Sequence, residues 1–102
     1  MFKIQPNPTF SATVLIPVTG GDPMPLEVEY KHRTVDELQA FANSMRDRPP
    51  AEVCVDMLVG WKGVDQEFSP DALAQLLQNY ALAADALATQ YLAAYRDAKR
   101  GN

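Results

Sequence analysis

The sequence predicts an α+β fold in which an N-terminal antiparallel β-hairpin precedes a small bundle of about four helices. Apolar residues recur at every second position in the first third of the chain, and at every third or fourth position from Thr34 onward. The chain has 102 residues, which is enough for one modest core. We therefore expect a single domain, 1–102, made of a β-hairpin region, 1–33, and a helical region, 34–102.

Two alternating runs predict the hairpin. Residues 10–18 place apolar side chains at even positions, and Pro17 has no N–H group, so this strand should end there or form a sheet edge. A loop rich in glycine and proline, 19–25, leads to a second run, 26–32. The expected inward face of this second run consists of Leu26, Val28, Tyr30 and His32. A lone hairpin is marginal in water, so the helices should cover its apolar face.

The first two helices are predicted from their end signals. Thr34 and Glu37 have the spacing of a capping box, and the helix that they begin should reach about Met45. Pro49-Pro50 ends that helix and can open the next, a short helix within 51–59, for which a buried strand is the alternative. The apolar face of the first helix is expected to consist of Val35, Leu38, Phe41, Ala42 and Met45.

The last two helices follow a glycine-flanked segment, 60–63, which we expect to be a tight turn around the only tryptophan. Ser69-Pro70-Asp71 combines a cap, a proline at the first helical position and an acid that meets the helix dipole. An alanine-rich helix follows from about Ala84 and should end near Lys99-Arg100-Gly101. Whether these two helices are separate or continuous is left open by the sequence.

The balance of charge argues against two classes of partner. Thirteen acidic residues outnumber nine basic ones, which gives a net charge of −4 at pH 7. Nucleic acids and anionic membranes are bound through broad basic surfaces. The basic clusters here, such as Lys31-His32-Arg33, are short. We therefore expect neither nucleic acid nor membrane as a partner.

The location of the protein is inferred from two features. The N-terminal residues hold no continuous apolar stretch of the kind found in secretory leaders, and no run reaches the roughly 20 residues that span a bilayer. A single cysteine, Cys54, cannot form an internal disulfide, which fits a reducing compartment. We therefore expect a soluble intracellular protein.

The residues that carry most enzyme chemistry are scarce. His32 is the only histidine, and it lies in an alternating strand, while Cys54 lies in an apolar run typical of a core. One histidine and one cysteine cannot supply the four ligands of a structural zinc site. Glu27 and Glu29 share a strand face with Lys31, which is typical of a solvated face. We expect no catalytic residues, no metal and no cofactor.

Aromatic residues stand at positions that a small core does not require. Trp61 lies between two glycines, and Phe68 follows seven residues later. These two side chains either close the core or form an exposed anchor, since tryptophan is enriched at binding hot spots. Tyr80, Tyr91 and Tyr95 either pack internally or present a face to another helix.

Within 52–102 several short motifs follow one another in a recognisable order. They are the Gly-Trp-x-Gly-Val turn at 60–64, Phe68-Ser69, Ala72-Leu73, the pair Leu76-Leu77, Tyr80, and the ending Arg100-Gly101-Asn102. In these motifs the C-terminal half resembles the tail assembly chaperones of long-tailed bacteriophages and prophages. One departure is Leu82, close to where a proline separating the last two helices is expected.

The resemblance implies a non-catalytic role in building a phage tail. Such a chaperone would bind the tape measure protein, keep it soluble and help recruit tail tube subunits, in the host cytoplasm and not in the mature particle. It would also self-associate. The resemblance and the apolar patterning together favour the helical region for these contacts. The candidate partner-binding residues are Met57, Trp61, Phe68, Leu73, Leu77, Tyr80, Tyr91 and Tyr95.

A second interpretation remains open. The chain would then be a small acidic protein-binding module, either a regulator or a structural subunit, that docks one folded partner through its helical face. A tape measure chaperone should instead make many weak contacts along one long partner, which gives avidity without tight single sites.

Overall fold

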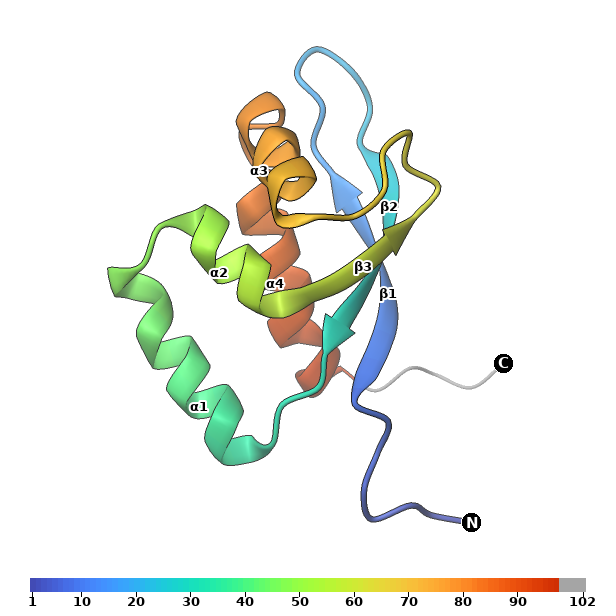
Figure 1. Cartoon of the computed structure of the whole chain (residues 1–102), viewed down its shortest axis with the longest axis vertical. Helices are drawn as coiled ribbons and strands as arrows, with labels where there is room; N and C mark the ends of the chain where they lie inside the picture. Colours follow the sequence, from blue (N-terminus) through green and yellow to red (C-terminus); the bar gives the residue numbers. More distant parts are fainter. Residues whose placement is uncertain (98–102) are drawn as a thin grey trace.

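The computed structural model describes residues 1–97 and confirms the α+β class, with a β-hairpin followed by four helices (Figure 1). The strands are β1 (Thr9–Ile16), β2 (Met24–Lys31) and β3 (Leu58–Lys62). The helices are α1 (Val35–Ser44), the 3₁₀ turn η1 (Met45–Asp47), α2 (Pro50–Met57), α3 (Pro70–Asn79) and α4 (Ala83–Arg96). The predicted helix end at Lys99-Arg100-Gly101 lies outside the described residues.

The hairpin has the predicted inner and outer faces. β1 and β2 are antiparallel, with Phe10 opposite Tyr30 and Val14 opposite Leu26. The even positions of both strands face the helices, and the odd positions form the outer face of the sheet. β1 ends directly before Pro17 and is an edge strand, because the order in the sheet is β1-β2-β3.

The third strand was not predicted, and the expected tight turn at 60–63 is wrong. β3 leaves α2 at Leu58 and pairs with β2, where Trp61 lies opposite Val28. The chain turns only after Lys62, the last residue of β3, at Gly63, whose φ of 70° suits glycine. In the hairpin alone, one edge of β2 would have no hydrogen-bonding partner. β3, which is distant in sequence, pairs with that edge, and no local pattern encodes this pairing. The short helix predicted within 51–59 is confirmed as far as Met57, and Leu58 and Val59 belong to β3.

Local capping signals fix where the helices begin. The capping box of α1 is confirmed, with Glu37 N donating to Thr34 Oγ1 at 3.2 Å and Thr34 N donating to Glu37 Oε1 at 2.9 Å. Ser69 Oγ accepts from Ala72 N at 3.0 Å and caps α3. The expected inward position of Val35 is wrong, since its side chain is 85% exposed. Phe41 packs in the core and Leu38 and Met45 pack against it, whereas Val35 does neither.

The last two helices are separate. α3 ends at Asn79 and α4 begins at Ala83, joined by a turn in which Ala83 N donates to Tyr80 O at 3.0 Å. The chain therefore reverses without a proline, and Leu82 precedes α4 as an exposed residue.

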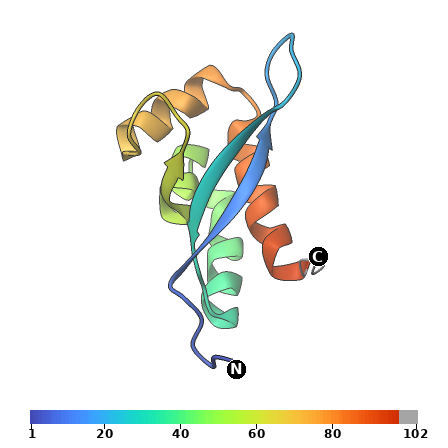
Figure 2. The same ribbon diagram turned by 90° about the vertical axis from the view of Figure 1, so that its right-hand side faces the viewer.

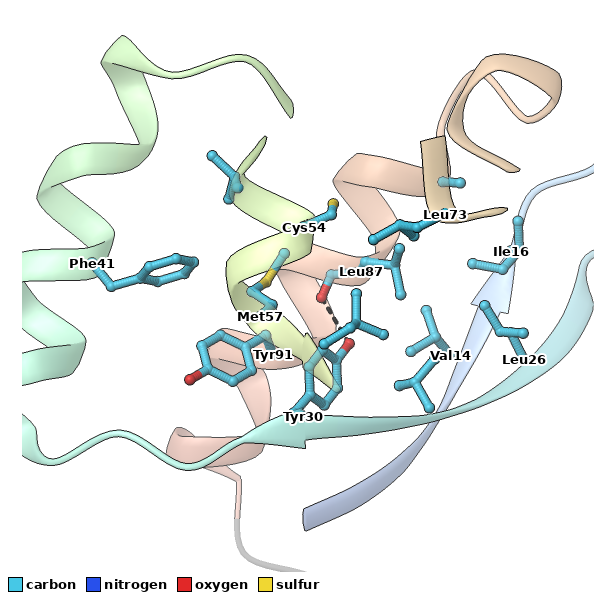
Figure 3. Close-up of a cluster of buried hydrophobic side chains, with 14 residues drawn as sticks. Val14, Ile16, Leu26, Tyr30, Phe41, Cys54, Met57, Leu73, Leu87 and Tyr91 are labelled. Atoms are coloured by element: carbon cyan, nitrogen blue, oxygen red, sulfur yellow. Dashed lines mark hydrogen bonds between the residues drawn. The ribbon is translucent and has the colours of Figure 1, made fainter. Parts of the chain in front are cut away.

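The core lies between the inner face of the sheet and the helices (Figure 3). α4 packs against β1 and α2, and α2 packs against α3. Tyr30 OH donates to the carbonyl of Leu87 at 2.8 Å, which satisfies the phenol within the core. None of the helices in residues 1–97 has the length and hydrophobicity required to cross a bilayer.

Candidate functional site

A groove of about 520 Å³ lies at the end of the molecule that carries the tip of the hairpin. Three segments form it: the hairpin tip, the loop that follows β3, and helix α3 (Figure 1). Its apolar lining includes Met24, Leu26, Trp61, Val64, Leu76 and Tyr80. This surface is the candidate functional site.

The hairpin contributes the floor of the groove and one rim. Ile16 and Leu26 lie at the ends of their strands and are buried. Met24, at the start of β2, is 60% exposed. Methionine is flexible and polarizable, so it adapts to partners of different shape. A buried floor with an exposed methionine at its rim suits a surface that receives an apolar side chain.

Trp61 forms the wall on the side of β3. Its indole Nε1 donates to the carbonyl of Gln66 at 2.9 Å. Trp61 packs on Phe68 in an edge-to-face contact, with ring centroids 5.1 Å apart and ring planes at 89°. The loop between them starts at Gly63, so the turn, the hydrogen bond and the ring contact together hold the half-buried indole in place.

Helix α3 forms the opposite wall. Leu76 is half-buried, and Tyr80 at the end of the helix is 36% exposed. Leu73, one turn before Leu76, is buried in the core. The helix therefore uses one side to join the core and a neighbouring side to line the groove.

The surroundings of the groove are acidic. Asp65 is part of the lining, and Asp22, Glu67 and Asp71 are exposed at nearby positions of the same three segments. Lys62 is the one basic residue in 16–26 and 58–80, and in the strand register it stands opposite Glu27 on the outer face of the sheet, the face away from Trp61. An apolar segment that carries positive charge fits these surroundings.

The structure divides the predicted partner-binding residues into two groups. Met57, Leu73 and Tyr91 have no exposed surface, so a partner cannot reach them in this fold. The first two fill the space between helices and sheet, and Tyr91 packs in an aromatic cluster. The side chains that keep exposed surface are Trp61, Phe68, Leu77, Tyr80 and Tyr95.

Trp61 and Tyr80 come together at the groove, and Phe68 supports Trp61 from behind. Leu77 lies on α3 and packs in part against the core. The apolar groove residues that sequence reasoning missed as a site are Met24, Leu26, Val64 and Leu76. An apolar methionine between two prolines in a polar loop was the available signal for Met24.

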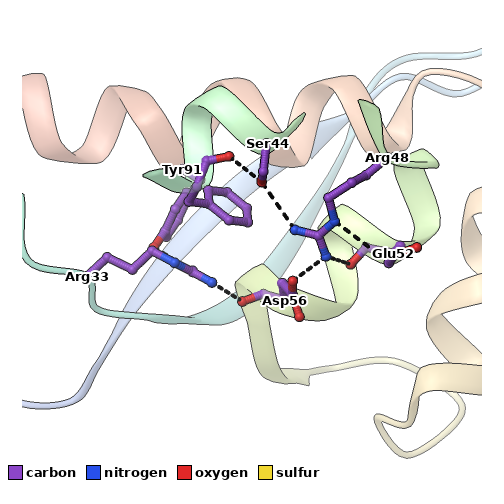
Figure 4. Close-up of polar contacts among 7 residues, drawn as sticks. Arg33, Ser44, Arg48, Glu52, Asp56 and Tyr91 are labelled. Carbon is purple, nitrogen blue, oxygen red and sulfur yellow. Dashed lines mark hydrogen bonds and ion pairs between the residues drawn. The ribbon is translucent and has the colours of Figure 1, made fainter. Parts of the chain in front are cut away.

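Tyr95 lies elsewhere, in a polar network around Arg33. The main-chain N–H of Arg33 donates to Tyr95 OH at 2.8 Å, and its guanidinium donates to Tyr91 OH at 3.0 Å. The guanidinium also donates to Asp56 O at 3.0 Å (Figure 4). The same guanidinium lies 4.0 Å from the centroid of the Phe41 ring. Burial and the hydrogen bond between its hydroxyl and that of Tyr91 raise the pKa of Tyr95. The network joins β2, α1, α2 and α4, so its role is to stabilise the fold.

A second polar cluster lies beside this network, on the surface of α2. Arg48 donates to Glu52 Oε1 at 3.1 Å and to Ser44 Oγ at 3.3 Å, and it pairs with Asp56 (Figure 4). The hydrogen bond to Asp56 raises the pKa of Arg48. These contacts tie the end of α1 to α2.

The residues considered for chemistry are dispersed. His32 is half-buried with its ring 6.0 Å from that of Tyr95, and Cys54 is buried with a pKa raised by burial to about 11. Such a thiol is a poor nucleophile at neutral pH. Glu29 accepts a hydrogen bond from Thr9 on the outer face of the sheet. Within residues 1–97, no three His, Cys, Asp or Glu side chains gather as they would around a metal ion.

The comparisons with known proteins agree with the C-terminal resemblance and extend it over the whole chain. A family model described as phage tail assembly chaperone matches residues 1–102. No curated protein and no solved structure matches the chain significantly.

Proposed function

The chain belongs to the phage tail assembly chaperone family, and we propose that it binds the tape measure protein, keeps that long protein soluble and helps recruit tail tube subunits during tail assembly. It acts without catalysis, in the cytoplasm of the host cell, and is absent from the mature particle. The observation that carries the proposal is the apolar groove with exposed Met24 and Tyr80 on a chain of this family.

The groove has the properties that a holding chaperone needs. It is open to solvent, apolar within and acidic around, so it can cover an apolar segment while the complex keeps net negative charge. Each contact is small, so each is weak and reversible. Many copies along one long client would together give avidity.

The hairpin takes part in this surface together with the helical region. Met24 and Leu26 come from β2, and β2 is also the partner of β3. A cut between the two regions would separate β3 from β2 and destroy the groove. Binding therefore has to be tested with the whole chain and single substitutions.

Co-expression with the tape measure protein of the same phage tests the proposal. The soluble fraction of the tape measure protein should rise when the chain is present, and several copies should purify with each client molecule. Tyr80→Ser and Met24→Lys should each lower the co-purified amount several-fold. Val35→Ser is the matched control, because it changes an exposed apolar residue away from the groove.

Two outcomes contradict parts of the proposal. A client that precipitates regardless of the chain removes the chaperone role and favours a module that docks one folded partner. A client that stays soluble with Tyr80→Ser and Met24→Lys as it does with the unchanged chain removes the groove from that role.

A further inference from the structure

The first eight residues form an arm whose apolar side chains are uncovered. Phe2 is 91% exposed and Ile4 is 92% exposed, and Lys3 stands between them. The arm is held at its base, where the carbonyl of Pro8 accepts a hydrogen bond from His32 N at 2.9 Å. Residues 1–8 thus present the apolar side chains of Met1, Phe2 and Ile4 and the positive charge of Lys3 to solvent.

The arm complements the groove. Phe2 and Ile4 match its apolar walls, and Lys3 matches its acidic surroundings, of which Asp65 is part of the lining. Pro6 and Pro8 fix their own φ angles and favour extended backbone at Gln5 and Asn7, which lowers the entropy lost when the arm docks.

The arm and the groove of one molecule lie far apart. The N-terminus and the tip of the hairpin are at opposite ends of the longest axis, which measures 44 Å (Figures 1 and 2). To reach its own groove, the arm would have to turn at Thr9 and run back fully extended beside β1. Pro6 and Pro8 lack the N–H groups that would hold it there by strand pairing.

We infer that the arm of one copy docks in the groove of a second copy, with Phe2 and Ile4 against Trp61 and Leu76 and with Lys3 toward Asp65. The contact is small, so it forms at high protein concentration and dissociates readily. This inference rests on the proposed function in one respect: the arm covers the groove until a segment of the tape measure protein displaces it.

Self-association of the purified full chain, without any tape measure protein, tests the inference. Molar mass is measured by light scattering over a hundredfold range of concentration. The unchanged chain should grow in mass with concentration, and Phe2→Ser with Ile4→Ser should raise the dissociation constant at least about tenfold. Met24→Lys should do the same from the groove side, and Val35→Ser should associate like the unchanged chain.

Mixing the two kinds of variant separates this contact from any other. The arm variant keeps an intact groove, and Met24→Lys keeps an intact arm, so an equimolar mixture should form 1:1 pairs that neither protein forms alone. Circular dichroism confirms that each variant is folded. A chain that stays monomeric at every concentration, or a mixture that forms no pairs, overturns the inference and leaves the client assay unaffected.

Discussion

The two ends of this small molecule both carry aromatic residues, but these residues are buried at one end and partly exposed at the other. Near the base of the hairpin, Tyr30 and Tyr91 are buried with ring centroids 4.9 Å apart, and the Tyr91 hydroxyl donates to Lys31 O at 2.8 Å. At the groove end, Trp61 is half-buried and Tyr80 is exposed. At one end, the closed end, the rest of the chain covers Tyr30 and Tyr91. At the groove end, Trp61 and Tyr80 keep exposed surface.

The difference follows from which elements cover each end. α4 packs along β1, and the Arg33 guanidinium donates to Tyr91 on α4 and to Asp56 on α2. Tyr30 and Tyr91 at the centre of the aromatic cluster are therefore fully buried. Within residues 1–97, no buried side-chain nitrogen or oxygen lacks a hydrogen-bond partner. α3 stops at Asn79, and the chain turns away into α4 before the groove is covered. Stability is therefore concentrated at the closed end.

The largest expected effect comes from the same substitution made at both ends. Tyr91→Ala removes a buried ring and a hydroxyl that bonds to Lys31 O and Arg33, so it should lower the free energy of unfolding by about 3–5 kcal/mol. Tyr80→Ala removes an exposed ring and should cost less than about 1 kcal/mol. Urea denaturation measures both.

The comparison of the two ends depends on that contrast. Equal losses for Tyr91→Ala and Tyr80→Ala would mean that the groove end is part of the stabilising core. In that case the exposed aromatic residues would have a structural role, and the groove would lose its main support as a binding surface.

The second prediction concerns alkaline pH and the core thiol. Burial raises the pKa of Cys54 from 9.0 to about 11. Above pH 9 the unfolded chain loses this proton while the folded chain keeps it, so stability falls as pH rises from 9 to 11. Two pKa units correspond to about 2–3 kcal/mol.

Cys54→Ala is the matched control for this prediction. The variant has no thiol to ionise, so the difference in unfolding free energy between it and the unchanged chain should shrink in alkali. Burial also raises the pKa of Tyr30, and this effect of burial is common to both proteins, whereas the further rise caused by the charge of Cys54 is lost together with the thiol. A difference that stays constant from pH 8 to pH 11 would show that Cys54 is open to solvent.

The parts of the fold that sequence reasoning found are those encoded locally. Alternation located β1 and β2, the spacing of Thr34 and Glu37 gave the start of α1, and Ser69-Pro70 gave the start of α3. Each signal depends on neighbours within a few residues. Strand β3 was missed because its pairing depends on β2, about 30 residues earlier, and because glycines around Trp61 are typical of turns.

The groove could not be predicted for the same reason. Its walls come from three segments, and helical spacing alone does not tell which side of α3 or α4 meets the sheet. Tyr91 and Tyr95 lie one turn apart on α4 and bond to each other at 3.1 Å, yet only Tyr91 is fully buried. The family resemblance gave the class of function, and the contacts decide which aromatic residues remain for a partner.

The smallest expected effect tests whether local capping or the closed end holds α1. Thr34 is the cap of this helix, and Phe41 is its only buried residue. Thr34→Ala leaves the Glu37 amide without its partner and should lower the free energy of unfolding by about 1 kcal/mol. The Arg33 contact with Phe41 should keep the helix in place, so helical content should stay unchanged.

The pH dependence of this variant gives the check. Hydrogen bonds from Thr34, first from its main-chain N–H, lower the pKa of Glu37 below 4.5, so its contribution to stability is present above that pH and is lost as the solution becomes more acidic. Thr34→Ala removes the side-chain hydrogen bond, and Glu37→Gln removes the titrating group. The small loss of stability between neutral and acidic pH should therefore shrink in Thr34→Ala and vanish for this residue in Glu37→Gln. A loss of helical content in Thr34→Ala would instead mean that the cap, rather than the contact between Arg33 and Phe41, holds α1 to the closed end.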